Sequence, residues 1–209
     1  MPAVVPVPKN EQERLQKLLH YGVLDTPPSE AFDRVTRLAS RLLNMPIALV
    51  SLVDKDRQWF KSRVGLDAAE TPRELAFCAH AICGTDVLVV PNAEADSRFA
   101  DNPLVTGAPD IRFYAGAPLR TEEGLNMGTL CVIDRAPREF SEEDRALLND
   151  LAHIVIDELE LHALARREKE ARGQLIEAIE AAPDAFVLYD SEDRLALCNE
   201  KFRDFVQDG

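Results

Sequence analysis

Long apolar runs and positive charge are both scarce in this sequence. No apolar stretch approaches the ~20 residues that a helix needs to span a bilayer. Lysine and arginine number 24 against 37 aspartates and glutamates, so the formal net charge is −13. Nucleic acids and anionic membrane surfaces attract basic patches. We therefore expect neither a nucleic acid nor a membrane as a partner.

Cysteine is also scarce. The four cysteines lack the spacing of a disulfide framework, which favours reduced thiols in a cytoplasmic protein. The first ten residues, MPAVVPVPKN, lack the basic start and the long apolar core of a secretory signal. We expect a cytoplasmic location and a flexible N-terminal tail over residues 1–9.

The sequence is organised around one stretch, Ile111–Asp134. Its aromatic, β-branched and small residues predict two strands, Arg112–Leu119 and Asn126–Ile133, joined by a polar turn that contains Gly124. Small residues in these strands indicate that another part of the molecule approaches them closely. The small residues are Gly116, Ala117, Gly128 and Thr129.

The segments before this hairpin show helical and strand patterns in turn. Asn10 and Glu13 predict a capping box for a first helix that ends near His20. Spaced apolar side chains predict a second helix over Ser29–Leu43. Runs rich in β-forming residues predict three further strands, at Ile47–Val53, Gln58–Val64 and Asp86–Val90.

Two further segments carry weaker patterns. Glu70–Cys83 is predicted to be a short helix or an ordered loop. Asn92–Asp110 is long, polar and without obvious structure, which is typical of a binding loop or lid. All these elements together indicate an α+β fold, with helices on one face of a sheet and a cavity under loops on the other.

A long helix is predicted to begin at Ser141 and to end near Ala181. Ser141 is a good N-cap, and the acidic residues after it suit the positive end of the helix dipole. A helix of about 40 residues spans ~60 Å, too long to be covered by one domain of this size. We therefore predict a coiled-coil-like homodimer, with a solvated C-terminal helix as the alternative.

Two apolar stripes run along this helix. One is expected to pack on the sheet of its own domain and the other to face a partner helix. The residues predicted to lie on the dimer side are Leu147, Leu151, Ile154, Leu161 and Ala165. The second stripe comprises Leu148, Val155 and Leu159.

The end of the chain predicts two short strands and a helix, at Phe186–Tyr189, Arg194–Leu197 and Asn199–Val206. Two strands and one helix are marginal as an independent unit. We therefore interpret residues 182–209 as the truncated start of a second domain.

Several sequence blocks resemble a GAF domain of the kind found at the front of bacterial signalling proteins. The blocks are Tyr21–Pro28, Pro46–Arg63, Glu70–Ile82, Ser97–Gly107, Phe113–Leu119 and Gly128–Asp134. They resemble a subgroup that precedes histidine kinase, diguanylate cyclase or nucleotide cyclase outputs. Residues 174–206 look like the opening of a PAS domain, with Asn199 where PAS domains often carry an asparagine.

The resemblance implies a GAF domain over residues 10–160, a signalling helix over residues 161–181 and the PAS fragment after it. It also implies an antiparallel sheet flanked by helices, a ligand pocket on the opposite face and parallel dimerisation through the linker helix. The implied function is a sensory input and dimerisation module of a cytoplasmic signal-transduction protein, as in two-component systems.

The ligand is not identified by known motifs of the family. The Asn-Lys…Phe…Asp-Glu signature of cyclic-nucleotide-binding GAF domains is not found. Bilin-binding relatives carry an adjacent Cys-His pair, whereas Cys78 and His80 are separated here. Cys78, His80 and Cys83 do not share one helix face, so we predict no metal site. The cofactor stays unknown.

Aromatic and cationic residues near the predicted loops are the candidate ligand contacts. They are Trp59, Phe77, His80, Phe99, Arg112 and Tyr114. Arg112 is suited to an anionic ligand, with an ion pair to Asp101 or Asp110 as the alternative. Trp59 and Phe77 are equally suited to a core position.

Two other functions compete with the sensor hypothesis. Ile82-Cys83-Gly84-Thr85 resembles a block of the free methionine sulfoxide reductases, which are GAF enzymes that work through cysteine thiols. A GAF domain without ligand, serving only as a scaffold, is the other alternative. Because no convincing catalytic constellation is present, we expect that the chain is not an enzyme. A redox role for Cys78, Cys83 or Cys131 is left open.

Overall fold

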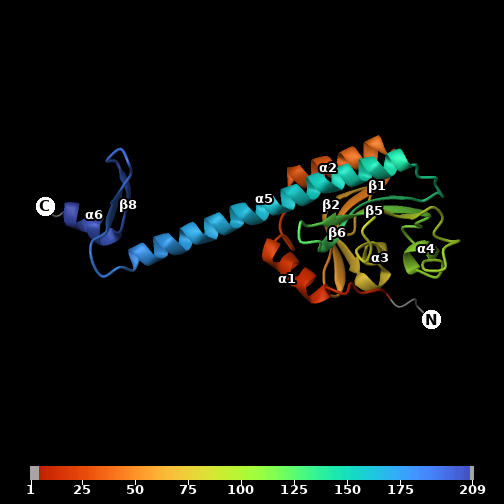
Figure 1. The fold of residues 1–209 in the computed structure, drawn as a ribbon, viewed down its shortest axis with the longest axis horizontal. Helices are drawn as coiled ribbons and strands as arrows, with labels where there is room; N and C mark the ends of the chain where they lie inside the picture. The colour runs from red at the N-terminus through yellow and green to blue at the C-terminus, as the bar shows by residue number, and fades with distance from the viewer. Residues whose placement is uncertain (1–4, 208–209) are drawn as a thin grey trace. The chain divides into compact units, whose positions relative to one another are not determined.

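A computed structural model describes residues 5–207 of the chain (Figure 1). The chain divides into two compact units between Ala163 and Leu164. The first unit contains a six-stranded sheet in the order β3-β2-β1-β6-β5-β4, with all neighbours antiparallel. The strands are β1 Ile47–Val53, β2 Arg57–Val64, β3 Glu70–Pro72, β4 Leu88–Val90, β5 Phe113–Arg120 and β6 Asn126–Asp134.

The predicted hairpin is confirmed as β5 and β6, and β6 also pairs with β1 at the centre of the sheet. The close approach expected at the small residues is present. A Cβ built on Gly128 would lie 1.9 Å from the carbonyl oxygen of Ser51 in β1. Only glycine therefore allows these two backbones to pair at their observed distance.

Six helical segments accompany the sheet. They are α1 Glu11–Tyr21, α2 Glu30–Leu42, the 3₁₀ helix η1 Arg73–Leu75, α3 Phe77–Ala81, α4 Pro103–Thr106 and α5 Glu142–Glu180. In the first unit, α2 and α5 run side by side over one face of the sheet, while α3 and α4 lie with the loops on the other face (Figure 1). The predicted α+β architecture, with helices flanking an antiparallel sheet, is confirmed.

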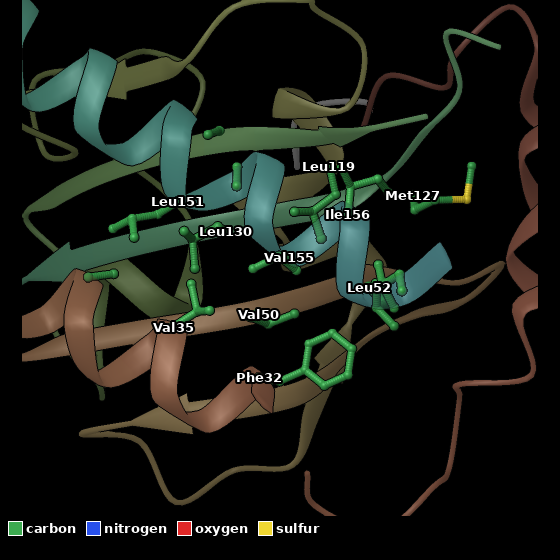
Figure 2. Packing of buried hydrophobic residues seen from close by; sticks show 14 of the residues in the cluster. Phe32, Val35, Val50, Leu52, Leu119, Met127, Leu130, Leu151, Val155 and Ile156 are labelled. Atoms are coloured by element: carbon green, nitrogen blue, oxygen red, sulfur yellow. The ribbon is translucent and has the colours of Figure 1, made fainter. Parts of the chain in front are cut away.

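An apolar core fills the space between the sheet and the helices α2 and α5, and we name it the helix-side core. Figure 2 shows Val50 and Leu130 from the strands beside Val35 of α2 and Val155 of α5. These side chains are almost completely removed from water. Each buried aliphatic side chain of this kind contributes roughly 1.5–3 kcal/mol to folding.

A second core lies on the opposite face of the sheet, and we name it the loop-side core. Its larger members are Ile47, Leu49, Phe60, Phe77, Phe99 and Tyr114. The segment Glu70–Cys83, for which we expected a short helix or an ordered loop, folds into β3, η1 and α3. The long segment 92–110 is ordered around α4, whose first turn is capped by Asn102: the Asn102 side chain accepts a hydrogen bond from the Leu104 N–H at 2.9 Å.

The stripe assignments on α5 are corrected at Leu151, and Leu147, also predicted on the dimer side, is half-buried and packs against the helix-side core. Leu151, predicted on the dimer side, is buried against the sheet together with Leu148 and Val155. Ile154 and Leu161 keep 50% and 61% of their surface exposed. The reason is helical geometry, because positions 148, 151, 152, 155 and 159 share one face at 3.6 residues per turn.

The residue types at three helix ends favour particular conformations, and two of the three agree with the structure. The predicted cap of α5 is confirmed: the Asp144 N–H donates to Ser141 Oγ at 3.1 Å, and the Ser141 N–H donates to Asp144 Oδ2 at 3.0 Å. Gly22 ends α1 in the left-handed conformation. The capping box predicted at Asn10 is wrong, since its backbone is not extended and its side chain makes no capping hydrogen bond.

The N-terminal tail predicted over residues 1–9 falls only partly within the structure. Residues 1–4 lie outside the described residues. Val5 packs against the loop-side core. Among the helices between residues 5 and 207, none combines the length and the apolar character that crossing a membrane demands.

The second unit contains the end of α5, the hairpin of β7 Val187–Tyr189 and β8 Leu195–Cys198, and α6 Glu200–Gln207. The buried Asn199 holds these pieces together. Its Nδ2 donates to the Asp184 carbonyl at 2.8 Å, and its Oδ1 accepts from the N–H groups of Phe186 at 2.8 Å and Phe202 at 3.1 Å. Residues 208 and 209 of the predicted PAS fragment lie outside the described residues. The assignment of this unit to a PAS domain stays a prediction.

Candidate ligand-binding site

Four of the six predicted ligand contacts come together in the loop-side core. The rings of Phe77 and Phe99 stack with centroids 4.0 Å apart, and Tyr114 lies 5.2 Å from Phe77. His80 meets the edge of this stack, 4.8 Å from Phe99. Phe77, Phe99 and Tyr114 are buried, so they fill the space between α3, the loop 92–110 and β5.

His80 lies where this stack reaches the surface. Burial is the main effect that lowers the pKa of His80, and the positive charge of Arg98 lowers it further, while Asp96 opposes the change. Because the pKa lies below its ordinary value near 6.5, the imidazole is neutral at pH 7. A neutral imidazole next to aromatic rings is suited to hydrogen bonding and not to binding an anion by charge.

Trp59 lies apart from the other candidates, in the helix-side core. Lys61 Nζ is 6.0 Å from its ring centroid and 5.4 Å from that of Phe32 in α2. The same ammonium donates to Thr26 Oγ1 at 2.8 Å and to the Pro27 carbonyl at 2.7 Å. Trp59 therefore belongs to the packing between β2 and α2.

Arg112 is anchored in the loop that precedes β5. Its Nη1 donates to the Val105 carbonyl at 2.8 Å, and its Nη2 forms an ion pair with Glu94 at 3.2 Å. The alternative prediction, an ion pair of Arg112 with Asp101 or Asp110, is wrong, because the carboxylate that pairs with Arg112 is Glu94. The loop folds back so that Glu94 and α4 reach the guanidinium.

A cavity of about 340 Å³ lies on the loop side of the sheet. Its floor is made by side chains of β1, β2 and β6, and its rim by the segments 65–71 and 104–111. Its lining includes Gln58, Ala68, Thr71, Leu104, Ile133 and Arg135. None of the six predicted contacts lines this cavity. The segment expected to be a binding loop contributes Leu104, Ala108 and Pro109 to its wall.

The wall of this cavity is mainly apolar, with a few polar groups. Gln58 is buried, and its Nε2 donates to Thr71 Oγ1 at 2.6 Å. Arg135 follows β6 at the rim, where its Nε donates to the Pro109 carbonyl at 3.1 Å. A small number of polar groups in an apolar cavity is the usual composition of a small-molecule site. Sequence reasoning missed Gln58, because its burial follows only from the pairing of β2 with β1 and β3.

Metal ligation has no structural basis in the part of the chain between residues 5 and 207, where no three His, Cys, Asp or Glu side chains are grouped to hold an ion. Cys78 and Cys131 are buried near each other, whereas Cys83 is exposed. Burial raises the pKa of the Cys83 thiol above its ordinary value. This is opposite to the low pKa that a nucleophilic thiol requires.

The GAF domain family matches residues 27–159. This chain belongs to the GAF family. The match covers the sheet, the cavity and the first part of α5, and it confirms the resemblance seen in the sequence blocks. The signalling helix and the PAS domain are not part of this match.

One known protein is similar to this chain in sequence, and two solved structures are similar to it in fold. The chain is 47% identical over 155 residues to a protein of Pseudomonas aeruginosa named a cyclic di-GMP phosphodiesterase, covering 74% of this chain and 26% of that protein. The GAF domain of an Acinetobacter phosphoenolpyruvate-protein phosphotransferase superposes with a TM-score of 0.55 at 18% identity, covering 75% of this chain and 96% of that chain. A free methionine-R-sulfoxide reductase of Neisseria meningitidis superposes with a TM-score of 0.54 at 19% identity, covering 74% and 90%. At these identities the two structures share the fold alone.

The expectation that the chain is not an enzyme is corrected by the first of these relatives. A protein that is 47% identical is named a phosphodiesterase, which points to an enzyme. The expectation rested on the lack of a catalytic constellation within 209 residues. The chain spans about a quarter of the length of this relative. The phosphodiesterase named for that protein therefore includes about three quarters of a chain that has no counterpart in this match.

Proposed function

We propose that this chain is the sensory GAF module of an enzyme that hydrolyses cyclic di-GMP, and that it binds a small molecule in the 340 Å³ cavity. The cavity is the observation that carries the proposal. The Pseudomonas relative supports the assignment to cyclic di-GMP signalling. A cytoplasmic location is part of this proposal, because that is where we expect the nucleotide to be hydrolysed.

The lining of the cavity points to a mainly apolar ligand with one polar group. Leu104 and Ile133 offer apolar contacts, while Gln58 and Thr71 offer a hydrogen-bonding site in the wall. The ligand stays in place by burial of its apolar part and is oriented by the polar pair.

Strand β6 provides a physical route from the cavity to α5. Ile133 lines the cavity, whereas its neighbours along the strand, Leu130 and Val132, pack in the helix-side core with Val155 of α5. A ligand that shifts β6 would therefore shift the packing of α5. Such coupling requires that the ligand binds the two arrangements with different affinity.

Native mass spectrometry of freshly purified protein tests the binding proposal, with denaturing mass spectrometry of the same sample. We expect an extra mass that is lost on denaturation. Ala68→Phe fills the cavity and is expected to remove this mass, whereas Ala95→Phe, an exposed position outside the cavity, is expected to keep it. A wild-type protein without any extra mass would favour the ligand-free scaffold.

We also propose that the chain forms a homodimer through the exposed side of α5. Ile154 and Leu161 are exposed there, and Leu38 and Leu42 on the neighbouring α2 extend the apolar surface. Leu161→Asp is expected to give a monomer in size-exclusion chromatography with light scattering. His153→Asp places the same charge at an exposed polar position of the same helix and is expected to leave the dimer intact. A monomeric wild-type protein at high concentration would refute the dimer.

Thiol-dependent reduction of methionine sulfoxide is the weaker proposal. Its candidate nucleophile, Cys83, has a raised thiol pKa and does not line the cavity. Turnover of free methionine sulfoxide that is lost in Cys83→Ser would restore this function, and a lack of turnover in the wild type would exclude it.

A further inference from the structure

Two buried thiols face each other on the loop side of the sheet, at a place that the proposed function does not use. Cys78 belongs to α3 and Cys131 to the central strand β6. Both are buried, and their Sγ atoms lie 3.9 Å apart. Disulfide formation brings two such atoms to about 2.05 Å, so a shift of about 2 Å suffices. Helix α3 has only five residues and lies between the short 3₁₀ helix η1 and a turn at residues 82–84, which makes this shift feasible.

The sulfur of Cys78 is surrounded by hydrogen-bond donors. Thr129 Oγ1 donates to it at 3.1 Å, and the Tyr114 hydroxyl donates at 3.4 Å. Ser51 is a third hydroxyl that hydrogen-bonds this thiol. Gly116 gives Tyr114 the space to do so, because a Cβ at position 116 would lie 2.1 Å from the Tyr114 hydroxyl oxygen.

These donors have an electrostatic consequence. Burial by itself raises the pKa of the Cys78 thiol, but the hydrogen bonds from Cys131, Ser51, Thr129 and Tyr114 outweigh burial and lower the pKa to about 6. The same contact with Cys78, together with burial, raises the pKa of the Cys131 thiol. The first proton therefore leaves the pair from Cys78, and the second is retained on Cys131. This asymmetry makes Cys78, and not Cys131, the attacking sulfur of the pair.

We propose that Cys78 and Cys131 are a reversible oxidation site for hydrogen peroxide, with Cys78 as the attacking sulfur and Cys131 as the resolving thiol. Cys78 first releases its proton, the resulting thiolate attacks a peroxide oxygen, the O–O bond breaks, and the departing hydroxide takes up the released proton to become water. The Cys131 thiol then attacks the Cys78 sulfur, the S–OH bond breaks, and a second water leaves. Two thiols and one peroxide thus become one disulfide and two waters. A small dithiol reverses the reaction.

The oxidation site is linked to the cavity by hydrogen bonds. Ser51 has one hydroxyl proton, which it gives either to the Cys78 sulfur or to Gln58 Oε1 at 3.3 Å, and Gln58 in turn contacts Thr71 in the cavity wall. A disulfide removes the thiolate, so the Ser51 proton is left to Gln58 and the Thr129 hydroxyl must find another partner. Oxidation is therefore expected to change the polar part of the cavity wall. This last step rests on the proposed function, whereas disulfide formation does not.

The test uses the full chain with Cys83→Ser and Cys198→Ser, so that only the buried pair remains. After exposure to hydrogen peroxide and alkylation under denaturing conditions, we expect the intact mass to show a loss of two hydrogens, a peptide that joins Cys78 to Cys131, and full reversal by dithiothreitol. Cys131→Ser in the same background is expected to retain a sulfenic acid on Cys78 that dimedone traps. Two thiols that both remain open to alkylation after peroxide would overturn the proposal.

A second measurement separates this site from ordinary buried cysteines. The rate of disulfide formation is expected to depend on pH through the Cys78 thiol, with Tyr114 and Cys131 as the titratable groups that face it. Thr129→Val removes one donor and is expected to move the rate profile to higher pH, so that at pH values below the Cys78 pKa the rate falls about tenfold for each unit by which the pKa rises. Thr129→Ser keeps the hydroxyl and is expected to restore the profile. An unchanged profile in Thr129→Val would overturn the role of these donors.

Discussion

The two faces of the central sheet differ in how completely they are filled. On the helix side, aliphatic side chains of α2 and α5 pack in one continuous core against β1 and β6. On the loop side, short helices and loops cover the same strands and leave a cavity of about 340 Å³ beside two buried thiols. Long helices pack as rigid rows, whereas loops must satisfy their own backbone groups and pack less evenly. The helix side is therefore the more completely packed face, and the loop side holds the cavity and the thiol pair on which the two proposals rest.

Removing the close contact inside the sheet would disrupt both faces at once and gives the largest expected effect. Gly128→Ala places a methyl 1.9 Å from the Ser51 carbonyl oxygen, so β1 and β6 must separate. We expect a loss of about 5 kcal/mol or more in the free energy of unfolding, measured by denaturant titration, because backbone atoms and not a flexible side chain must move. Gly173→Ala is the control, since its added methyl meets no atom within 4 Å. An equal effect of the two substitutions would contradict this account.

Two leucines of β1 compare the faces directly. Leu52 lies in the helix-side core, and Leu49 in the loop-side core, where it lines the cavity. Leu52→Ala is expected to cost about 3–5 kcal/mol and Leu49→Ala about 2–3 kcal/mol, because Leu49 already lacks neighbours on its cavity side. Thermal and denaturant unfolding of both variants measures the difference. A larger loss for Leu49→Ala would show that the loop side is the better packed face.

An ion cluster anchors the loop side to α1 and gives the smallest of the three effects. Arg73 of η1 contacts Glu11 Oε1 at 2.5 Å, and Arg14 contacts both Glu11 oxygens at 2.8 Å. Burial raises the pKa of Glu11, but the hydrogen bonds and charges of the two arginines outweigh it and lower the pKa to about 2.

Because the folded pKa of Glu11 lies below the unfolded value of 4.5, its contribution is complete above that value and is lost as the pH falls toward 2. Glu11→Gln is expected to cost about 1 kcal/mol at pH 7, after allowance for solvent screening, and nothing at pH 2. Urea titrations at both pH values measure this. Glu13→Gln, an exposed neighbour on the same helix, is the control. A loss that is the same at both pH values would argue against the ion cluster.

Much of the fold could be predicted from local patterns. The hairpin, the strand Ile47–Val53 and the start of α5 at Ser141 all follow from alternation, turn residues or a capping pair that lie within a few residues of one another. The GAF resemblance was likewise carried by contiguous blocks. The failed capping box at Asn10 had the right residues but the wrong backbone conformation, which composition alone does not report.

The candidate site was harder to predict, and Trp59 shows why. The pairing of β1 with β2 contains a bulge, so that Val50 pairs with Ser62 but Ser51 pairs with Phe60. A bulge shifts by one residue which side chains face which side of a sheet. Trp59 and Lys61 consequently point to the helix side, and Phe60 and Gln58 to the cavity. No periodic pattern in β2 reveals this shift.

Local patterns along the chain account for the longer strands and helices, because those elements depend on neighbours in the chain. Which side chains meet depends on the tertiary packing. Cys78 and Cys131 are 53 residues apart, and only the pairing of β6 with β5 and β1 brings Tyr114, Ser51 and Thr129 around the same sulfur. Contacts of this kind depend on register and on the packing of α3 over the sheet, which no local signal in the chain encodes.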